Sequence, residues 1–348
     1  MPKDLELAIV TGGNRGIGLA IVQGLWKTEN YHTIIACRSV SSGETAVKEV
    51  RGMPGSGELT VMQLDLCDFE SVRKFVGQVQ KLAASLAGNK GLRLLFNNAG
   101  ILRWQGRVYT KDGFEEHLQA NHLGHFLLTR ELGALLGKSN GARVVAVGSH
   151  LADYARIRWD NFNDVDGFEA YKQSKLMNLL MTVSLHATHA ASRSLYAFTI
   201  DPGEVNTGIT RHFPFASFID LVLKFMPERK TPDEGADSAL YCGLCEEEEA
   251  QRLSGNFIRE RQIVDLGTGT GSWFSRMTLS AVMRTDVDVG SHGPEAAQRL
   301  WSLSESLVDS KMTLPMPPPD VALSLSSLWE LLLALAIVFA AMFIAVFL

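Results

Sequence analysis

Apolar and polar positions alternate along the chain in blocks that are typical of a parallel β-sheet whose strands are joined by helices. Short apolar runs predict strands at 5–10, 33–37, 59–64, 92–96, 143–147 and 194–200. Longer stretches with apolar residues at helical spacing predict helices at 16–26, 43–51, 69–86, 114–136 and 171–190. This alternation predicts a single α/β domain with a doubly wound, Rossmann-type parallel sheet.

The last 18 residues, 331–348, form an apolar run without a charged side chain. As a helix this run would be about 27 Å long, close to the hydrocarbon thickness of a bilayer. Trp329 stands where an interfacial aromatic residue belongs. The sequence therefore predicts a globular domain at 1–310, a Pro/Ser-rich linker at 311–327 and a C-terminal transmembrane helix, the membrane anchor, at 328–348. A buried core helix and a helix in the membrane plane are the alternatives.

An anchor in this position would insert after synthesis and leave the domain on the cytosolic face of the membrane. Its sparse flanking charge favours the endoplasmic reticulum over the mitochondrial outer membrane. The N-terminal residues enter a predicted strand almost at once, so we expect no signal peptide.

The overall composition limits what the chain can bind. A chain of 348 residues with 46% hydrophobic content can bury a large core, which argues against disorder. A formal net charge of −5 without a long basic run argues against nucleic acid as a partner. Cys242 and Cys245 form a C-x-x-C pair on a predicted helix. Because zinc would need two more ligands nearby, we predict no metal site.

Two glycine-rich loops each follow an apolar run and could hold a nucleotide. In the first, Gly12, Gly16 and Gly18 make the turn between a strand and a helix, whose first amide groups can bind a pyrophosphate. The second, 263–271, is similar to the first loop of S-adenosylmethionine-dependent methyltransferases. Only 77 of the 348 residues follow Gly271, which is too few for such a domain. We therefore assign the cofactor to the first loop and interpret 263–293 as a glycine-rich insertion.

The candidate chemistry lies on Tyr171 and Lys175, which are four residues apart and share one face of a predicted helix. A nearby ammonium group favours the phenolate and would lower the tyrosine pKa from its usual value of about 10. Tyr171 would then act as general acid for carbonyl reduction and as base for the reverse step. Ser149 ends a predicted strand and could hydrogen-bond the substrate oxygen. For the Tyr–Lys pair alone, a solvated helix face is the alternative.

The order of these motifs resembles that of the short-chain dehydrogenase/reductase family. T-G-x-x-x-G-x-G at 11–18, N-N-A-G at 97–100, Asn121, Ser149, Y-x-x-x-K at 171–175 and P-G at 202–203 follow one another. Within that family the sequence is similar to the retinol dehydrogenase and carbonyl reductase branch. The resemblance implies that Asn121, Ser149, Tyr171 and Lys175 are catalytic, with Asn121 supporting a water-linked proton path.

The same resemblance implies a nicotinamide dinucleotide site built from several loops. The implied cofactor-binding residues are Thr11, Gly12, Asn14, Arg15, Gly16, Ile17, Gly18, Arg38, Asp65, Asn98, Ala99, Gly100, Tyr171, Lys175, Pro202, Gly203, Val205 and Thr207. NAD-specific sites place a carboxylate about 20 positions beyond the glycines, but this chain has Arg38 there. A guanidinium group at that position would bind a 2′-phosphate, with Arg15 as a second cation, so we predict NADP(H).

These features predict an NADP(H)-dependent oxidoreductase that passes a hydride between the nicotinamide and a lipophilic carbonyl or alcohol of the retinoid, steroid or lipid-aldehyde kind. The aromatic-rich segment 211–230, which the resemblance implies to be a substrate lid, indicates the lipophilic substrate, with core packing as its alternative. Asp201, where retinol dehydrogenases often carry His or Asn, and the insertion leave the retinoid assignment open. A catalytically silent, membrane-tethered NADP(H)-binding protein is the rival interpretation.

Overall fold

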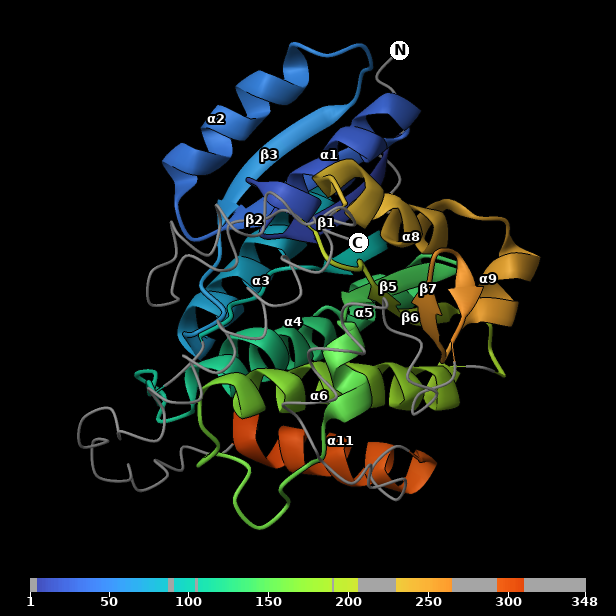
Figure 1. Cartoon of the computed structure of the whole chain (residues 1–348). Coiled ribbons are helices and arrows are strands. Elements are labelled where there is room, and N and C mark those ends of the chain that lie inside the picture. The colour runs from blue at the N-terminus through green and yellow to red at the C-terminus, as the bar shows by residue number, and fades with distance from the viewer. Residues whose placement is uncertain are drawn as a thin grey trace, which may run out of the picture.

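A mostly parallel sheet forms the centre of the protein (Figure 1). The structure, a computed structural model, describes residues 5–86, 91–103, 106–189, 191–205, 230–264 and 293–309. Within these residues eight strands run in the order β3-β2-β1-β4-β5-β6-β7-β8, all parallel except the β7–β8 pair. The strands are β1 (Glu6–Thr11), β2 (Tyr31–Cys37), β3 (Glu58–Gln63), β4 (Leu92–Asn97), β5 (Ala142–Val147), β6 (Leu195–Asp201), β7 (Phe257–Arg259) and β8 (Gln262–Ile263). The strand order reverses between β1 and β4, where open α/β sheets bind their ligands.

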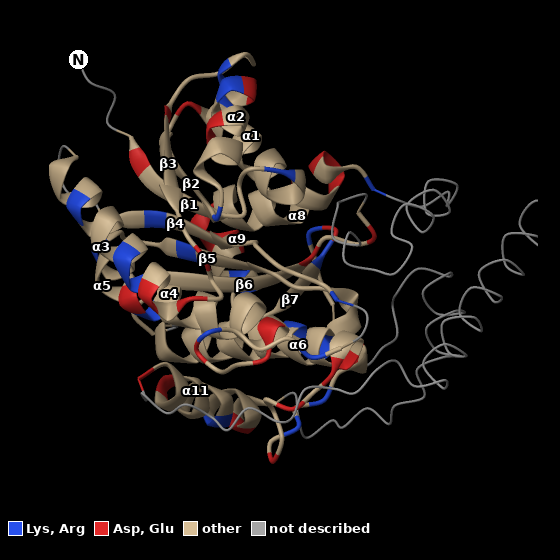
Figure 2. Cartoon of the chain, turned by 90° about the vertical axis from the view of Figure 1, so that its left-hand side faces the viewer, with Lys and Arg blue, Asp and Glu red and all other residues tan. Residues whose placement is uncertain are grey.

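Helices cover both faces of this sheet (Figure 2). One face carries α1 (Gly16–Thr28), α2 (Val40–Arg51), α8 (Pro232–Leu244) and α9 (Glu247–Leu253). The other carries α3 (Phe69–Ser85), α4 (Gly124–Glu131), α5 (Gly133–Lys138) and α6 (Gly167–His189), with α11 (Pro294–Asp309) packed against α6. Two short helices, η1 (Leu118–Leu123) and η2 (His150–Tyr154), lie near the ends of α4 and β5.

The apolar runs in the sequence reflect burial of the sheet on both sides. In β1, Leu7 and Ile9 belong to the core beneath α3 and α6, whereas Ala8 and Val10 belong to the core beneath α1 and α8. Successive strand side chains point to opposite faces, so a strand covered on both faces reads as one continuous apolar run. The Rossmann-type, doubly wound part of the predicted fold is therefore confirmed.

The helix predicted at 114–136 consists of shorter pieces. η1 is a π-helical turn that leads into α4. The helix is interrupted at Leu132, and α5 begins at the next residue. A Cβ on Gly124 would lie 2.6 Å from the carbonyl oxygen of Leu66, so this stretch passes close to another backbone. Apolar residues continue through all the pieces, and the sequence pattern therefore does not mark the breaks.

The structure corrects one part of the predicted fold, the C-terminal transmembrane helix. Among the residues that the structure describes, no helix has both the length and the apolar character needed to cross a bilayer. The last described helix, α11, is amphipathic, with one buried apolar face packed against α6. The linker 311–327 and the segment 328–348 lie outside the described residues. The cytosolic orientation and the endoplasmic reticulum location, which depend on that segment, stay predictions.

Candidate active site

The predicted site residues gather where the carboxyl ends of β1, β4, β5 and β6 meet. The glycine loop follows β1, the N-N-A-G sequence ends β4, Ser149 follows β5 and Pro202 follows β6. Tyr171 and Lys175 reach the same edge of the sheet from α6. Thr207 lies outside the described residues. The parallel sheet thus brings together segments that are far apart in the sequence.

The glycine loop has a backbone that only glycine fits well, and it leaves amide groups open. Gly12 and Gly16 have φ values of 64° and 55°, a region that favours glycine. A Cβ on Gly18 would lie 2.3 Å from the carbonyl oxygen of Gly12 and 2.5 Å from Asn98 Nδ2. α1 begins at Gly16 without a side-chain cap and without an acidic residue in its first turn. Its first amide groups are therefore open to a phosphate, so the loop fits a dinucleotide.

Thr11 joins this loop to the end of β4 and to a buried histidine. Its Oγ1 accepts hydrogen bonds from the backbone N–H groups of Asn98 and Ala99, both at 2.9 Å. Asn98 Nδ2 donates to the carbonyl oxygen of Thr11 at 2.7 Å. His125 Nε2 lies 2.9 Å from Thr11 Oγ1, and His125 Nδ1 lies 3.0 Å from the carbonyl oxygen of Asn121. These bonds hold the loops after β1 and β4 in a fixed position relative to η1.

Asn121 occupies the π-helical turn η1, a feature that is frequent at functional sites. Its Oδ1 accepts the N–H of Ile101 at 2.9 Å, and its Nδ2 donates to the carbonyl oxygen of Ile101 at 3.1 Å and to Ser174 Oγ at 3.0 Å. A Cβ on Gly100 would lie 3.5 Å from both Asn121 Oδ1 and Lys175 Nζ. Asn121 thus fastens the loop after β4 to α6, directly beside Lys175.

Ser149, Tyr171 and Lys175 form a buried cluster, with exposures of 8%, 5% and 3%. The side chain of Ser149 acts on the Tyr171 hydroxyl, and Ser149 Oγ accepts the N–H of Leu151 at 3.2 Å. Lys175 Nζ donates to the carbonyl oxygen of Val147 at 2.8 Å and lies 5.5 Å from the centroid of the Tyr171 ring. The structure therefore brings together the serine, tyrosine and lysine that the sequence predicts to be catalytic.

Burial has the largest effect on the protonation of this cluster. It raises the pKa of Tyr171 above the usual value, and the Ser149 hydrogen bond opposes the rise while the Asp201 charge adds to it. Burial also lowers the pKa of Lys175 to about 8, and Asp201 opposes that change. The predicted lowering of the Tyr171 pKa by Lys175 is not found, because burial raises this pKa instead. A neutral phenol is the proton donor that carbonyl reduction needs.

The cations predicted to bind the cofactor phosphate stand at neighbouring strand ends. Arg15 precedes α1 and Arg38 follows β2, and both side chains are exposed. Within the described part of the chain neither guanidinium group pairs with a carboxylate. Asp65, beyond the end of β3, accepts the N–H of Cys67 at 3.0 Å through Oδ1. Gln63 Nε2, at the end of β3, donates to the backbone carbonyl oxygen of Arg38 at 3.3 Å, so Arg38 lies beside the end of that strand.

Comparison with known proteins agrees with this geometry. The family model described as short chain dehydrogenase matches residues 6–214, more than half of the chain. The chain belongs to the short-chain dehydrogenase family. It is 33% identical to retinol dehydrogenase 11 of Mus musculus over 307 residues, which cover 87% of this chain and 86% of the relative. It is 34% identical to polyprenol dehydrogenase of Homo sapiens over 265 residues, or 74% of this chain and 77% of the relative.

A solved structure gives a further likeness. The Pseudomonas aeruginosa RhlG/NADP active-site complex is 25% identical to this chain, with a TM-score of 0.57. The match covers 75% of this chain and 97% of the solved chain. Almost the whole of that solved chain therefore has a fold similar to that of this protein.

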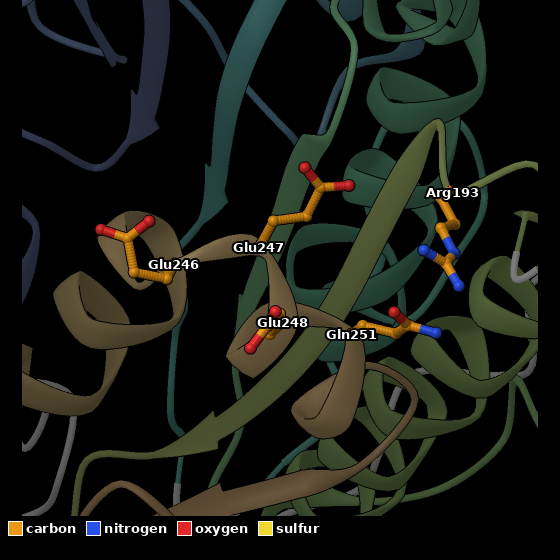
Figure 3. A pocket seen from close by; sticks show the side chains of 5 residues that line it. All are labelled: Arg193, Glu246, Glu247, Glu248 and Gln251. Atoms are coloured by element: carbon orange, nitrogen blue, oxygen red, sulfur yellow. The ribbon is translucent and has the colours of Figure 1, made fainter.

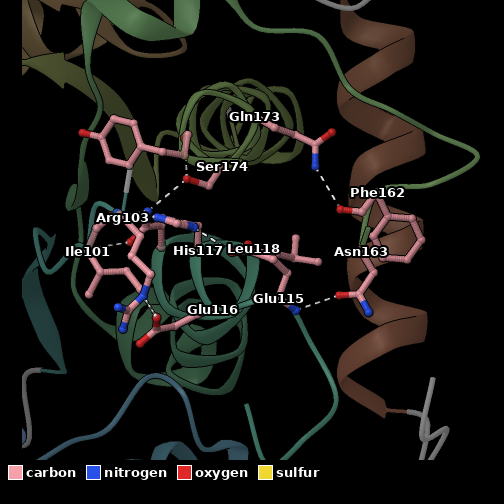
Figure 4. Close-up of polar contacts among 12 residues, drawn as sticks. Ile101, Arg103, Glu115, Glu116, His117, Leu118, Phe162, Asn163, Gln173 and Ser174 are labelled. Carbon is pink, nitrogen blue, oxygen red and sulfur yellow. Dashed lines mark hydrogen bonds and ion pairs between the residues drawn. The ribbon is translucent and has the colours of Figure 1, made fainter. Parts of the chain in front are cut away.

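A buried Glu–His pair in this dehydrogenase was not predicted from the sequence (Figure 4). His117 Nε2 accepts the backbone N–H of Arg103 at 2.8 Å, and His117 Nδ1 lies 2.7 Å from Glu115 Oε1. Because one ring nitrogen accepts, the other carries the proton and donates it to the carboxylate. The His117 ring meets the Tyr171 ring edge-on, with 6.2 Å between centroids. The pair thus holds the backbone of Arg103 close to the tyrosine.

Gln173 was also missed, and it positions the segment before α6. Its Oε1 accepts the N–H of Arg158 at 2.8 Å, and its Nε2 donates to the carbonyl oxygen of Phe162 at 3.0 Å (Figure 4). Asn163 Oδ1 accepts the N–H of Glu115 at 2.8 Å. Their signal in the sequence is that polar residues occupy positions where a segment packed in the core would normally carry apolar ones.

An open, polar pocket lies away from this site. It is lined by Arg193, Glu246, Glu247, Glu248 and Gln251 (Figure 3). Arg193 precedes β6, so the pocket borders the amino end of that strand, whereas the cluster of Ser149, Tyr171 and Lys175 lies at the carboxyl ends. The candidate site and this pocket therefore lie at opposite ends of the strands.

The second glycine-rich loop begins in a setting that does not suit a methyltransferase. Ile263 is the last residue of β8, a two-residue strand that pairs antiparallel with β7 at the edge of the sheet. A nucleotide loop of that kind would follow a parallel strand inside an α/β sheet. Most of 263–271 lies outside the described residues.

Proposed function

We propose that the chain is an NADP(H)-dependent oxidoreductase that interconverts a lipophilic alcohol and its carbonyl compound, with Tyr171 as general acid and base. The observation that carries this proposal is the buried cluster of Ser149, Tyr171 and Lys175, in which Lys175 Nζ lies 5.5 Å from the centroid of the Tyr171 ring. Two hydroxyl groups that meet at the carboxyl edge of the sheet can bind one substrate oxygen together. The relatives named retinol dehydrogenase and polyprenol dehydrogenase support a lipophilic alcohol as the substrate class.

The residues around the glycine loop would hold NADP(H). The open amide groups at the start of α1 suit the pyrophosphate, and Arg15 and Arg38 suit the 2′-phosphate. Lys175 would bind the nicotinamide ribose, with Pro202 and Gly203 beside the nicotinamide. The NADP complex of the related solved structure supports this cofactor class. When bound, NADP(H) supplies or accepts the hydride.

The remaining chemistry belongs to the side chains of the protein. In reduction, Tyr171 donates its phenolic proton to the substrate oxygen while Ser149 donates a hydrogen bond to the same atom. In oxidation, Tyr171 accepts the proton back. Lys175, with its pKa lowered to about 8 by burial, can exchange a proton in the working range. Asn121 contributes by keeping the loop after β4 in place next to Lys175.

A carbonyl screen tests the proposed function. Full-length protein with NADPH is offered all-trans-retinal, a steroid ketone, a long-chain fatty aldehyde and a quinone, and NADPH oxidation is followed by absorbance. We expect turnover with at least one lipophilic carbonyl. NADPH binding without turnover on any of them would favour the catalytically silent alternative.

Replacement of Arg38 by Asp is expected to weaken NADPH binding about 10- to 100-fold, the value of one or two charge-assisted hydrogen bonds. NADH binding should change little, because a carboxylate there can accept the ribose 2′-hydroxyl. Fluorescence titration with both cofactors measures the effect. Arg51→Asp, at the exposed end of α2, is the matched control because it makes the same charge change. Equal losses for NADPH and NADH would contradict the phosphate contact.

A further inference from the structure

A buried carboxylate ends the strand that leads to the nicotinamide-bordering turn. Asp201 is the last residue of β6 and is 2% exposed. It stands in parallel register with Arg259, the last residue of β7, whose Nε donates to Asp201 Oδ2 at 2.7 Å. The second carboxylate oxygen, Oδ1, accepts the N–H of Gly203 at 3.0 Å. One side chain therefore closes the Pro202–Gly203 turn and also forms an ion pair.

This ion pair lies next to the catalytic cluster. β5 and β6 are paired up to Val147 and Ile200, so the residues that follow β5 run beside Asp201. The carbonyl of Val147 is the acceptor for Lys175, and the charge of Asp201 raises the pKa of both Lys175 and Tyr171, each after the larger effect of burial. The carboxylate thus acts on both groups that the proposed reaction protonates and deprotonates.

We propose that the Asp201–Arg259 ion pair is a positioning element of the active site, which holds the Pro202–Gly203 turn and sets the electrostatic potential at Tyr171 and Lys175. This inference rests on the proposed function, because it concerns the general acid of the same reaction. Its physical basis is that a charge in a site of low dielectric acts strongly on its neighbours. Arg259 places the opposite charge against the same carboxylate, so its removal would leave Asp201 without this counter-charge.

The other charged and titratable groups around the cluster are few among the described residues. His150 Nδ1 lies 4.0 Å from Asp201 Oδ1, and His117 meets the Tyr171 ring edge-on. Burial lowers the pKa of His125, near Lys175, to about 4, so this ring is neutral at physiological pH. Lys230 lies along Gly203 and pairs with Glu260 at 2.9 Å. Replacement of Asp201 removes a negative charge near the cluster, and replacement of Arg259 removes a positive one. The two replacements therefore change the local net charge in opposite directions.

Replacement of Asp201 and replacement of Arg259 are expected to shift the pH dependence of turnover in opposite directions. Asp201→Asn removes the negative charge and leaves the Arg259 cation, so the pKa of Tyr171 and that of Lys175 both fall. Arg259→Gln leaves the carboxylate uncompensated, so both pKa values rise. Whichever group governs the profile, we expect the first variant to move it to lower pH and the second to higher pH, each by about one pH unit. Loss of a merely structural contact would not give shifts of opposite sign.

The test records kcat/KM against pH for full-length protein with NADP+ and all-trans-retinol. Arg259→Lys keeps the charge and should keep the wild-type profile. Arg261→Gln is the matched control, because this exposed neighbour pairs with Asp237 at 2.8 Å and its loss removes one positive charge from the same hairpin. Thermal unfolding of each variant shows whether it is folded, and if Asp201→Asn unfolds, the comparison of Arg259→Gln with Arg259→Lys decides alone.

The outcomes separate this inference from the proposed function. Opposite shifts for Asp201→Asn and Arg259→Gln, with both controls unmoved, support the ion pair as a positioning element. An active wild type whose variants show unmoved profiles, or shifts in the same direction, would overturn the inference and leave the function standing. A wild type that turns over no carbonyl or alcohol contradicts the proposed function itself.

Discussion

Replacement of Tyr171 by phenylalanine is expected to lower kcat for reduction of a lipophilic aldehyde by about 10²- to 10⁴-fold, the usual contribution of a positioned general acid. The ring itself should stay in place, because it packs in a small apolar cluster with Leu102 and Leu151 and stacks on Phe168 at 6.3 Å. Only the hydroxyl, on which Ser149 acts, is removed. NADPH binding should therefore remain close to that of the wild type, measured by fluorescence titration alongside stopped assays of turnover.

Tyr241→Phe is the control for this prediction. The Tyr241 hydroxyl donates to Glu249 Oε1 at 2.8 Å, between α8 and α9, so the substitution removes a bonded tyrosine hydroxyl away from the site. We expect its kcat to match that of the wild type. Turnover by Tyr171→Phe within a few-fold of the wild-type rate would rule out Tyr171 as the proton donor.

The sheet and the catalytic spacing could be predicted because both are local properties of the sequence. Each central strand is buried on two faces and therefore appears as an apolar run, and Tyr171 and Lys175 share a helix face because they are four residues apart. The hairpin of β7 and β8 has strands of three and two residues, too short for any periodicity to show. The π-helical turn at Asn121 likewise interrupts no apolar pattern.

The electrostatics of the site could not be predicted, because they depend on burial and on partners far away in the chain. The sequence places Lys175 one turn from Tyr171, but burial has the larger effect on both pKa values. Asp201 appears in the sequence only as an unusual residue before Pro202, and its partner Arg259 lies 58 positions further on. Only the register of β6 with β7 brings these two charges together.

The substitution Gly18→Ala is expected to weaken NADPH binding by at least about tenfold and to lower stability by about 1 to 3 kcal/mol, the usual cost of overpacking. The added Cβ would lie 2.3 Å from the carbonyl oxygen of Gly12, a backbone atom that cannot rotate away, and 2.5 Å from Asn98 Nδ2. Relief of either contact displaces the glycine loop or breaks the bond from Asn98 to Thr11. Both changes disturb the amide groups that would hold the pyrophosphate.

Gly77→Ala provides a matched comparison, because it makes the same chemical change inside another helix. An added Cβ on Gly77 meets no atom within 4 Å, and α3 continues on both sides of it. Alanine there should stabilise the protein by about 0.5 to 1 kcal/mol through its better helix propensity and leave cofactor binding unchanged. Thermal unfolding and fluorescence titration of the two variants separate the close approach at Gly18 from a general effect of removing a glycine. If Gly18→Ala binds NADPH as tightly as Gly77→Ala does, the glycine loop is not where the cofactor phosphates lie.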